Sequence, residues 1–523
     1  MLRNLRPFVF WPTFLVLMAA LLFSLIDLTG FLTSVTALND LILKNFSWVF
    51  SLGSFYLVVL AVITYFSPLA NLRIGGSDAK PMLTKPRWFF VTLCTTIAVG
   101  LLFWTTAEPI YHLNAPPASM TELSPGTPKT ARFAISAMYL HWSFTPYAIY
   151  AIPSLVFALA FYNRKLPFSI SSSLEPVFGK AVSHGTAAQL IDTIAMYALV
   201  TGMAASLGTG ALTLIGGIGE FSPVTSTPVS LGITIALVVG AFVASAASGL
   251  HKGIARLSAV NVVLLLLLGG FVFIFGPTVF ILTFGAEGLG EYLGNFLTLS
   301  LFTGASADDI WPKDWSVFYW AVWFAWAPVS ALFLGRIARG YTVREFLQIN
   351  LIFPSLFAIV WIAIFSGTSI NIDLNETGTM NTVLNDQGIE KLLYFMMGTM
   401  PFKSVLVIAL VFIAFISYVT AADSNTDAIG TLCTKDFTAE SSGDSTLPIK
   451  VLWGTIIGFV AWIMVSFAGI DGIRMLSNLG GLPAMLLILA GSLTLIRWLR
   501  NPTKIQGSSP AQIEAEQPQS IGS

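Results

Sequence analysis

Long apolar runs are the feature that most restricts how this chain can fold. Stretches of about 20 or more mostly apolar residues recur along its length, and the charged residues are concentrated between them. Only 10% of the 523 residues are charged and 55% are hydrophobic, whereas an average soluble domain has roughly 25% charged residues. A single soluble core could not bury so much apolar surface. The sequence therefore predicts an all-α protein that crosses a membrane many times.

A spanning helix needs about 20 mostly apolar residues, and by this criterion twelve segments are predicted. They lie near residues 8–32, 46–66, 88–107, 133–161, 187–216, 229–249, 257–283, 314–336, 349–370, 402–424, 451–470 and 475–496. The first run is too long for the apolar part of a signal peptide. Residues 285–304 alternate apolar and polar groups, which favours an amphipathic helix at the membrane surface over a thirteenth span.

The basic residues predict the orientation in the membrane. If the N-terminus is cytoplasmic, the inside termini and loops contain 19 of the 26 Lys and Arg residues. Both termini are therefore expected on the cytoplasmic side of a cell inner (plasma) membrane, with 497–523 as a disordered tail. The net charge of zero gives no indication of a nucleic-acid partner. The two cysteines, Cys94 and Cys433, indicate no disulfide framework or metal cluster.

Two predicted helices place aromatic residues near the middle of the membrane. In the fourth segment, Trp142 lies about nine residues from the outer end, roughly 14 Å deep, where tryptophan is unusual. Tyr147 and Tyr150 follow on a similar face, and Pro146 can open the backbone there. The eighth segment brings Trp323 to about the same depth. On its helix, the residues Trp315, Tyr319, Trp323 and Trp326 share one face.

An aromatic cage is a physical solution for binding a quaternary ammonium group. Such a cation has no N–H to donate, so the faces of aromatic rings supply the attraction. The alternative interpretation is that these rings only pack the two helices together. Glu108, directly before Pro109, is interpreted as a structural anchor rather than a ligand, and Trp104 as either an interface residue or a ligand. The small residues of 206–210 favour close helix packing, and Asp423 either caps an element or helps to hold a cation.

At these residues the sequence resembles the betaine/choline/carnitine transporter family. The matching stretches lie in the family's order along nearly the whole membrane domain. They are Phe103–Pro109 with His112 and Pro116-Pro117, His141–Tyr150, Ser206–Gly210, Gly249–Ser258 with Asn261, Trp315–Pro328 followed by Arg336–Gly340 and Arg344–Phe346, and Thr420–Ser424. The Trp-rich eighth segment followed by the Arg-Ile-x-Arg-Gly run is highly specific.

The resemblance implies a LeuT-like fold of two inverted five-helix repeats preceded by two extra helices. The expected parts are 1–87 with two helices, 88–283 as the first repeat, 284–313 as the amphipathic connecting helix and 314–496 as the second repeat. Family members are commonly homotrimers in the lipid membrane. Carried over by motif, the substrate-binding residues are Trp142, Tyr147, Tyr150 and Trp323, with Trp320 and Trp326 on the access route and Ile97 and Gly100 in the third segment.

The sequence also departs from the family pattern. Members that bind glycine betaine typically have Trp where this chain has Tyr147 and Val322, which leaves the identity of the solute open. Sodium-coupled relatives hold an ion with carbonyls of the third segment and hydroxyls of the tenth. That implies a sodium site at Ile97, Thr420 and Ala421, although Ala421 replaces a serine. A second ion site of the family is expected to be lost, because Leu199 and Met203 replace threonines.

The expected function is alternating-access import of a trimethylammonium or related onium solute: glycine betaine, choline, carnitine or a sulfonium analogue. Transport is expected to be coupled to a cation. Sodium is the candidate coupling ion, and no other cofactor is expected. Proton coupling or substrate exchange stays open. The alternative on the same fold is a transporter or exchanger of amino acids or other zwitterions. An enzyme is not expected, because the one nucleophile–base pair, His141 and Ser143, occupies helix positions that do not face each other.

Overall fold

The computed structural model describes residues 5–96, 100–247, 251–376, 378–434 and 447–505. Over these residues the chain is helical, and its only strand-like features are two isolated bridges, Leu5 with Thr434 and Arg73 with Thr342. The protein is therefore all-α, as the apolar runs predict.

Eighteen helices make up most of the described chain, together with short 3-10 and π turns. They are α1 (Pro7–Ile26), α2 (Leu28–Phe66), α3 (Lys85–Thr96), α4 (Gly100–Asn114), α5 (Pro128–Trp142), α6 (Phe144–Ala158), α7 (Glu175–Phe178), α8 (Gly185–Ile218), α9 (Pro228–Ala247), α10 (His251–Phe275), α11 (Thr278–Ser300), α12 (Phe318–Arg336), α13 (Val343–Leu347), α14 (Phe353–Asn375), α15 (Thr379–Gln387), α16 (Leu392–Gly398), α17 (Lys403–Cys433) and α18 (Leu447–Arg500).

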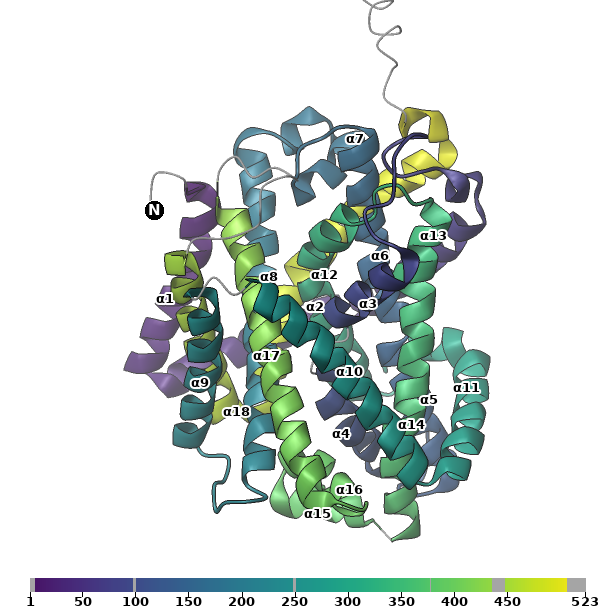
Figure 1. The fold of residues 1–523 in the computed structure, drawn as a ribbon, viewed down its shortest axis with the longest axis vertical. Coiled ribbons are helices and arrows are strands. Elements are labelled where there is room, and N and C mark those ends of the chain that lie inside the picture. The colour runs from purple at the N-terminus through teal and green to yellow at the C-terminus, as the bar shows by residue number, and fades with distance from the viewer. Residues whose placement is uncertain (1–4, 97–99, 248–250, 377, 435–446, 506–523) are drawn as a thin grey trace, which may run out of the picture.

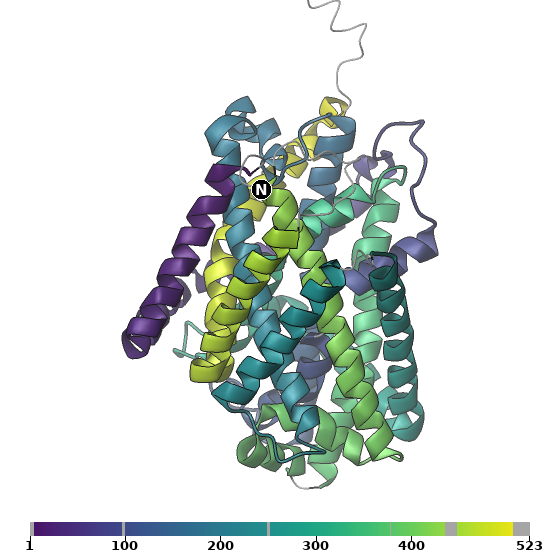
Figure 2. The ribbon, with the colours of Figure 1, turned by 60° about the vertical axis from the view of Figure 1, so that its left-hand side comes forward.

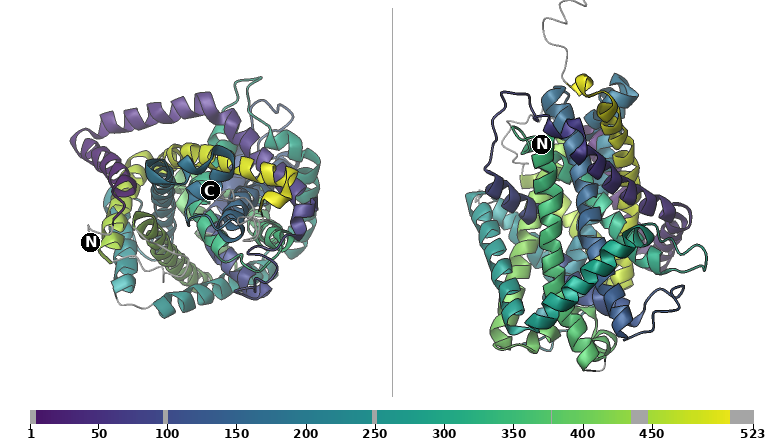
Figure 3. Two further views of the ribbon diagram at one scale, coloured as in Figure 1. Left: turned by 90° about the horizontal axis from the view of Figure 1, so that it is seen from above. Right: turned by 90° about the vertical axis from the view of Figure 1, so that its right-hand side faces the viewer.

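The long helices form a bundle with a buried centre and an apolar outer surface (Figure 1). Helices α6, α8 and α12 are buried along almost their whole length, and α18 packs against both α8 and α12. Helix α1 lies along the outside of the bundle (Figure 2) and, with α2, at its periphery (Figure 3). Their exposed residues are large and apolar, such as Leu15, Val16 and Val62, which is the pattern expected for a surface in contact with lipid.

Among the described residues, nine helical segments are long and apolar enough to cross a membrane. A tenth is the pair α10 and α11, whose axes are bent by 104° at the break between them. Three of the predicted segments are not separate helices of this kind. The third corresponds to α3 and α4, which flank the undescribed residues 97–99, and the last two are joined in α18. Within α18 the backbone is non-helical at Gly469, with φ 56° and ψ −132°.

Some predicted boundaries are wrong. The first predicted segment, 8–32, extends across the junction between α1 and α2 at Asp27, whose carboxylate accepts a hydrogen bond from the backbone N–H of Gly30 at 2.8 Å. That N-terminal cap begins a second helix without an intervening polar loop. Helix α2 then continues for 39 residues, well beyond the predicted 46–66.

The amphipathic connecting helix also begins earlier than the predicted boundary at residue 284. Gly276 and Pro277 end α10, because proline cannot continue the helix, and α11 starts at Thr278. At the C-terminus, α18 extends to Arg500 and a short 3-10 turn covers Pro502–Ile505. The predicted disordered tail is therefore wrong for 497–505, and residues 506–523 lie outside the described part.

Candidate solute cavity

A cavity of about 250 Å³ lies in the centre of the bundle. Its walls come from α3, α4, α5, α6, α8, α10, α12, α14, α17 and α18, so it collects side chains from both predicted repeats. Every described residue that lines it is uncharged. A second, open depression is lined by charged groups such as Arg73, Lys85 and Glu345 at the ends of α3 and α13. The central cavity is the candidate site because it is enclosed by helices that cross the membrane.

Four aromatic residues form what we call the ring cluster: Trp142, Tyr150, Tyr319 and Trp323. All four line the cavity. The ring of Trp323 lies 5.6 Å from that of Trp142 and 5.1 Å from that of Tyr150, in edge-to-face arrangements. The ring of Tyr319 lies 5.2 Å from Trp142. These distances and angles are typical of favourable aromatic pairs, and the rings remain almost buried, with Trp142 8% and Trp323 5% exposed.

A break in the fourth predicted segment positions the cluster. Helix α5 ends at Trp142 and α6 begins at Phe144, with Ser143 in a non-helical conformation between them. Pro146 follows in the first turn of α6, where its missing N–H costs least. The carbonyl oxygen of His141 accepts a hydrogen bond from the indole N–H of Trp323 at 3.1 Å. The predicted opening of the backbone near Pro146 is confirmed. The hydrogen bond from Trp323 to the His141 carbonyl connects α12 directly to α5.

Most of the predicted site residues meet at the cavity. Trp142, Tyr150, Trp323, Trp326 and Gly100 line it. So do both members of the predicted sodium site that the structure describes, Thr420 and Ala421.

Three predicted residues are not brought to the cavity wall. Tyr147 contacts Trp323 from behind, at 6.1 Å between ring centres, and does not line the cavity. Trp320 is fully buried against the ring of His141, 5.7 Å away. Ile97 lies outside the described residues.

Some lining residues were not predicted as site residues. Tyr319 shares the helix face of Trp323, so its position was readable from the spacing of α12. Asn261 and Ser417 come from α10 and α17, and the amide nitrogen of Asn261 donates to the Ser417 hydroxyl at 2.6 Å. A buried Asn in an apolar helix is itself a signal of function, but the sequence alone did not indicate its partner.

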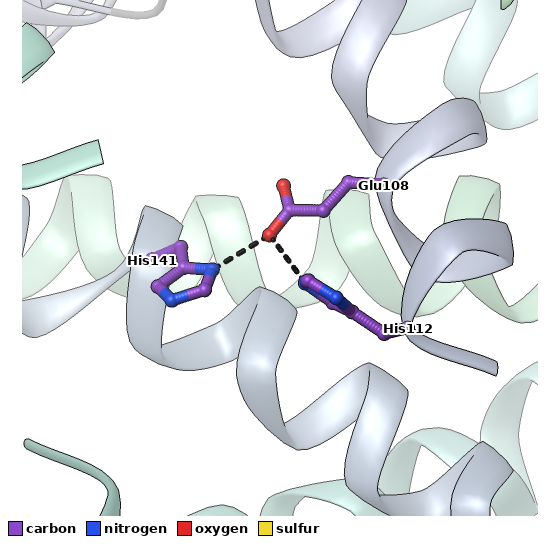
Figure 4. A group of neighbouring side chains, drawn as sticks. All are labelled: Glu108, His112 and His141. Carbon is purple, nitrogen blue, oxygen red and sulfur yellow. Dashed lines mark hydrogen bonds and ion pairs between the residues drawn. The ribbon is translucent and has the colours of Figure 1, made fainter. Parts of the chain in front are cut away.

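Behind the ring cluster lies a buried group that we call the Glu108 cluster: Glu108, His112 and His141 (Figure 4). Oε1 of Glu108 lies 2.6 Å from Nδ1 of His141 and 3.1 Å from Nε2 of His112. Oε2 accepts a hydrogen bond from the indole N–H of Trp142 at 2.8 Å. The facing atoms of the three residues lie within 4.8 Å of one another, and hydrogen bonds already occupy them. Glu108 is thus more than a helix anchor, because it holds a ring of the cavity wall.

The loop before α12 covers the Glu108 cluster on one side. Trp311 lies 4.9 Å from His112 and 6.0 Å from His141. Asp309 fastens this loop by accepting hydrogen bonds from the backbone and hydroxyl of Ser119 and from the backbone N–H of Trp311. Burial favours a raised pKa for Asp309, but these hydrogen bonds outweigh it and hold the pKa below its ordinary value.

Asp423 has a structural partner. Its carboxylate forms an ion pair with Lys450 of α18 at 3.0 Å, and both side chains are almost fully buried. The ion pair joins α17 to the first turn of α18.

The contacts from Glu108 to His141 to Ser316 follow the same order as the acid, base and nucleophile of a serine hydrolase. Nε2 of His141 lies 2.9 Å from the Ser316 hydroxyl. Ser316 is buried at 2% exposure and is not among the described residues that line the cavity. A nucleophile must reach its substrate, so this chain of contacts serves packing and orientation.

Many apolar helices around a central, uncharged cavity with aromatic walls define a polytopic membrane protein of the transporter class. The family model for the betaine/carnitine/choline family transporters matches residues 8–504. The chain belongs to this family, and it is a transporter rather than an enzyme.

Related proteins match over nearly their whole length. A glycine betaine transporter of Bacillus subtilis is 31% identical over 493 residues, covering 94% of this chain and 93% of the relative. An ectoine/hydroxyectoine transporter of Virgibacillus pantothenticus is 32% identical over 454 residues, covering 86% and 88%. An osmo-independent choline transporter of Acinetobacter baylyi is 28% identical over 507 residues, covering 96% and 94%.

Proposed function

We propose that this chain imports a small onium solute by alternating access, with the solute bound in the central cavity. The candidate solutes are glycine betaine, choline, carnitine and a sulfonium analogue. Supporting this, the relatives are named for glycine betaine, choline and ectoine. We further propose twelve spanning helices arranged as two inverted repeats, with residues 88–283 and 314–496 on either side of the cavity, and a homotrimeric assembly.

The observation that carries the proposal is the ring cluster in a cavity whose described lining is uncharged. A fixed onium charge cannot donate hydrogen bonds, so ring faces are the groups that attract it without a buried counter-ion in contact. A solute with a primary ammonium would instead require acceptors around its N–H groups. The cavity is smaller than a typical drug-sized pocket of roughly 300–1,000 Å³, which suits a solute of this size.

The polar lining residues supply the other end of the solute. Asn261, Ser417 and Thr420 line the same cavity as the rings. They match a hydroxyl or carboxylate group attached to the onium centre, and they account for a preference for choline or betaine over a bare tetraalkyl cation.

We propose sodium as the coupling ion, held near Thr420 and Ala421 by hydroxyl and carbonyl oxygens. Oxygen ligands suit such a hard cation. Thr420→Val keeps the shape of the side chain and removes its hydroxyl, so it is expected to raise the sodium concentration needed for half-maximal solute binding. Proton coupling and exchange predict binding that is independent of sodium in both proteins.

The test is a tryptophan-fluorescence titration of the purified chain with choline, glycine betaine, carnitine, a sulfonium analogue and ectoine, each with and without sodium. A saturable response that is lost in Trp323→Leu and kept in Trp48→Leu supports the proposal. Trp48 is the matched control because it is 56% exposed on α2. If Trp323→Leu keeps full binding, or an amino acid binds where no onium compound does, the alternative of an amino-acid or other zwitterion transporter or exchanger replaces it.

A further inference from the structure

A single indole ring connects a buried carboxylate to the wall of the cavity. The N–H edge of Trp142 donates to Oε2 of Glu108 at 2.8 Å, and Glu108 is 0% exposed. The opposite edge of the same indole, at Cη2, would lie 3.7 Å from a Cβ atom built on Gly100, a residue of the cavity wall. Glu108 therefore lies one ring away from any solute that contacts Trp142.

The hydrogen bonds identify Glu108 as an ionised carboxylate. The indole N–H of Trp142 can only donate, so Oε2 accepts. When His141 is neutral, its Nδ1–H donates to Oε1 and its Nε2 accepts from the Ser316 hydroxyl. The ring hydrogen of His141 and the hydroxyl hydrogen of Ser316 are then both paired. Nε2 of His112 supplies a third donor to the carboxylate. Three converging donors are the environment that favours an anion.

His112 does not neutralise this charge. Nδ1 of His112 has no hydrogen-bond partner among the described residues. Protonation of His112 would leave a buried N–H unpaired, which is costly, so the neutral form fits the site. Both histidines contact Oε1 of Glu108. Oε2, which accepts from Trp142, is therefore the carboxylate oxygen that faces the ring cluster.

A cationic side chain of α18 packs against this region. The guanidinium of Arg474 lies 4.8 Å above the ring of Trp315, which in turn lies 4.7 Å from the ring of His112. Arg474 already forms an ion pair with Asp471 at 3.1 Å. Its charge is therefore shared with a carboxylate of its own helix, and the indole of Trp142 remains the direct contact of Glu108.

We propose that Glu108 is the counter-charge of the ring cluster and acts on the bound onium centre through Trp142. An anion at the N–H edge increases the electron density on the indole face, which strengthens the attraction of that face for a cation. The carboxylate also attracts the cation directly across the ring. The residue touches no solute itself, so it determines selectivity for charge and has no catalytic part. The inference rests on the proposed onium site.

The expected size follows from Coulomb's law. An onium centre stacked on Trp142 lies about 9 Å from the carboxylate, and at an effective dielectric constant near 20 the attraction corresponds to about a twentyfold change in the dissociation constant. A neutral solute of the same shape would not gain this contribution. The prediction therefore concerns the ratio of two affinities and is independent of any uniform loss of folded protein.

The experiment compares each onium solute with its tert-butyl analogue, in which a quaternary carbon replaces the nitrogen. Dissociation constants for choline, glycine betaine and the two analogues are measured by calorimetry on the full chain in detergent, for the wild type, Glu108→Gln and Asp373→Asn. Asp373 is the matched control: it is a buried carboxylate bonded to Asn114 at 2.9 Å, away from the ring cluster. Gln keeps the shape and an acceptor for Trp142 while removing the charge.

We expect Glu108→Gln to weaken onium binding about twentyfold and to leave the tert-butyl analogues nearly unchanged. In a Trp142→Phe background its effect should be smaller, with the direct attraction across the ring remaining. Asp373→Asn should alter neither class. Equal weakening of the onium solutes and of their tert-butyl analogues, or no change in either, overturns the counter-charge role and leaves the onium site standing. If the wild type binds none of these onium compounds and none in the wider panel, the proposed function itself fails.

Discussion

Asn261 supplies a polar group to a cavity whose other walls are mainly aromatic and apolar. Its amide nitrogen donates to Ser417, whereas its carbonyl oxygen has no hydrogen-bond partner among the described residues. An unpaired buried acceptor is costly, and a solute hydroxyl would satisfy it. We therefore expect Asn261→Ala to weaken choline binding about tenfold, corresponding to about 1.4 kcal/mol.

The matched solute for this prediction is tetramethylammonium, which has the same onium centre and no hydroxyl. Its affinity should be unchanged in Asn261→Ala, because the ring cluster is intact. Fluorescence titrations with both compounds measure the two affinities. A parallel loss for tetramethylammonium would mean that Asn261 supports the shape of the cavity instead of contacting the polar end of the solute.

Individual residues also show where sequence reasoning succeeded and where it stopped. Helical rise alone predicted that Trp142 and Trp323 lie at one level of the bundle, and their rings do meet, 5.6 Å apart. Glu108 was interpreted as an anchor because it directly precedes Pro109. Its partner His141 belongs to another helix and lies 33 positions away in the sequence. Contacts between helices depend on packing, and one sequence does not reveal them. Tyr147 follows the break at Ser143 and contacts the ring of Trp323, whereas Tyr150 of the same helix lines the cavity.

Helix α12 is held in place by close contact with α18. A Cβ atom on Gly481 would lie 2.4 Å from the carbonyl oxygen of Ala321 and 2.6 Å from its Cα. Both are backbone atoms, so a side chain at this position must displace α12, which carries Tyr319 and Trp323. We expect Gly481→Ala to cost about 1–3 kcal/mol of stability and to reduce onium binding, as measured by thermal unfolding and titration.

The control for this element is Gly290→Ala on α11. A Cβ at Gly290 meets nothing within 4 Å, and alanine in an exposed helix stabilises by roughly 0.5–1 kcal/mol relative to glycine. Its onium affinity should equal that of the wild type. If Gly481→Ala also keeps full affinity, the close approach of α18 to α12 is not needed to position the rings.

The ion pair between Asp423 and Lys450 joins α17 to α18 within the bundle. Removing one partner leaves a buried charge uncompensated, so Lys450→Met should destabilise the protein by about 3–5 kcal/mol. The double variant with Asp423→Asn should recover most of that loss. Thermal unfolding of the three proteins in one detergent measures the coupling, and additive losses in the double variant would contradict it.

At the scale of elements, the long apolar runs were sufficient to predict that the helices exist, but not where each helix begins and ends. The turn Gly276-Pro277 is a readable helix break, yet the apolar run continues across it and hides the 104° bend. The same holds at Asp27, where a single capping residue separates two apolar helices. At Gly469 a local backbone change divides α18, close to the predicted boundary between 451–470 and 475–496. Length and hydropathy count apolar residues, and they are insensitive to a change of direction within them.

The molecule as a whole has charged groups at its ends and apolar side chains around its sides. The start of α1 and the end of α18 both lie toward the upper end of the bundle in Figure 1, as an even number of crossings requires. The charge distribution of the sequence predicts that this end is cytoplasmic. Orientation in a membrane depends on the lipid and on insertion, so this prediction needs an experiment on cells.

Two exposed lysines on opposite predicted sides provide that experiment. Lys129 lies in the first turn of α5 and is predicted outside, whereas Lys180 follows α7 and is predicted inside. Both side chains are exposed. Intact cells that produce Lys129→Cys should react with a membrane-impermeant maleimide, and those with Lys180→Cys should react only after lysis. The unmodified chain sets the background, to which the buried Cys433 should contribute little. Labelling of Lys180→Cys alone in intact cells would show the opposite orientation. Labelling of both variants would contradict the predicted number of crossings between the two positions. Positions on opposite faces cannot both meet a reagent that does not cross the membrane.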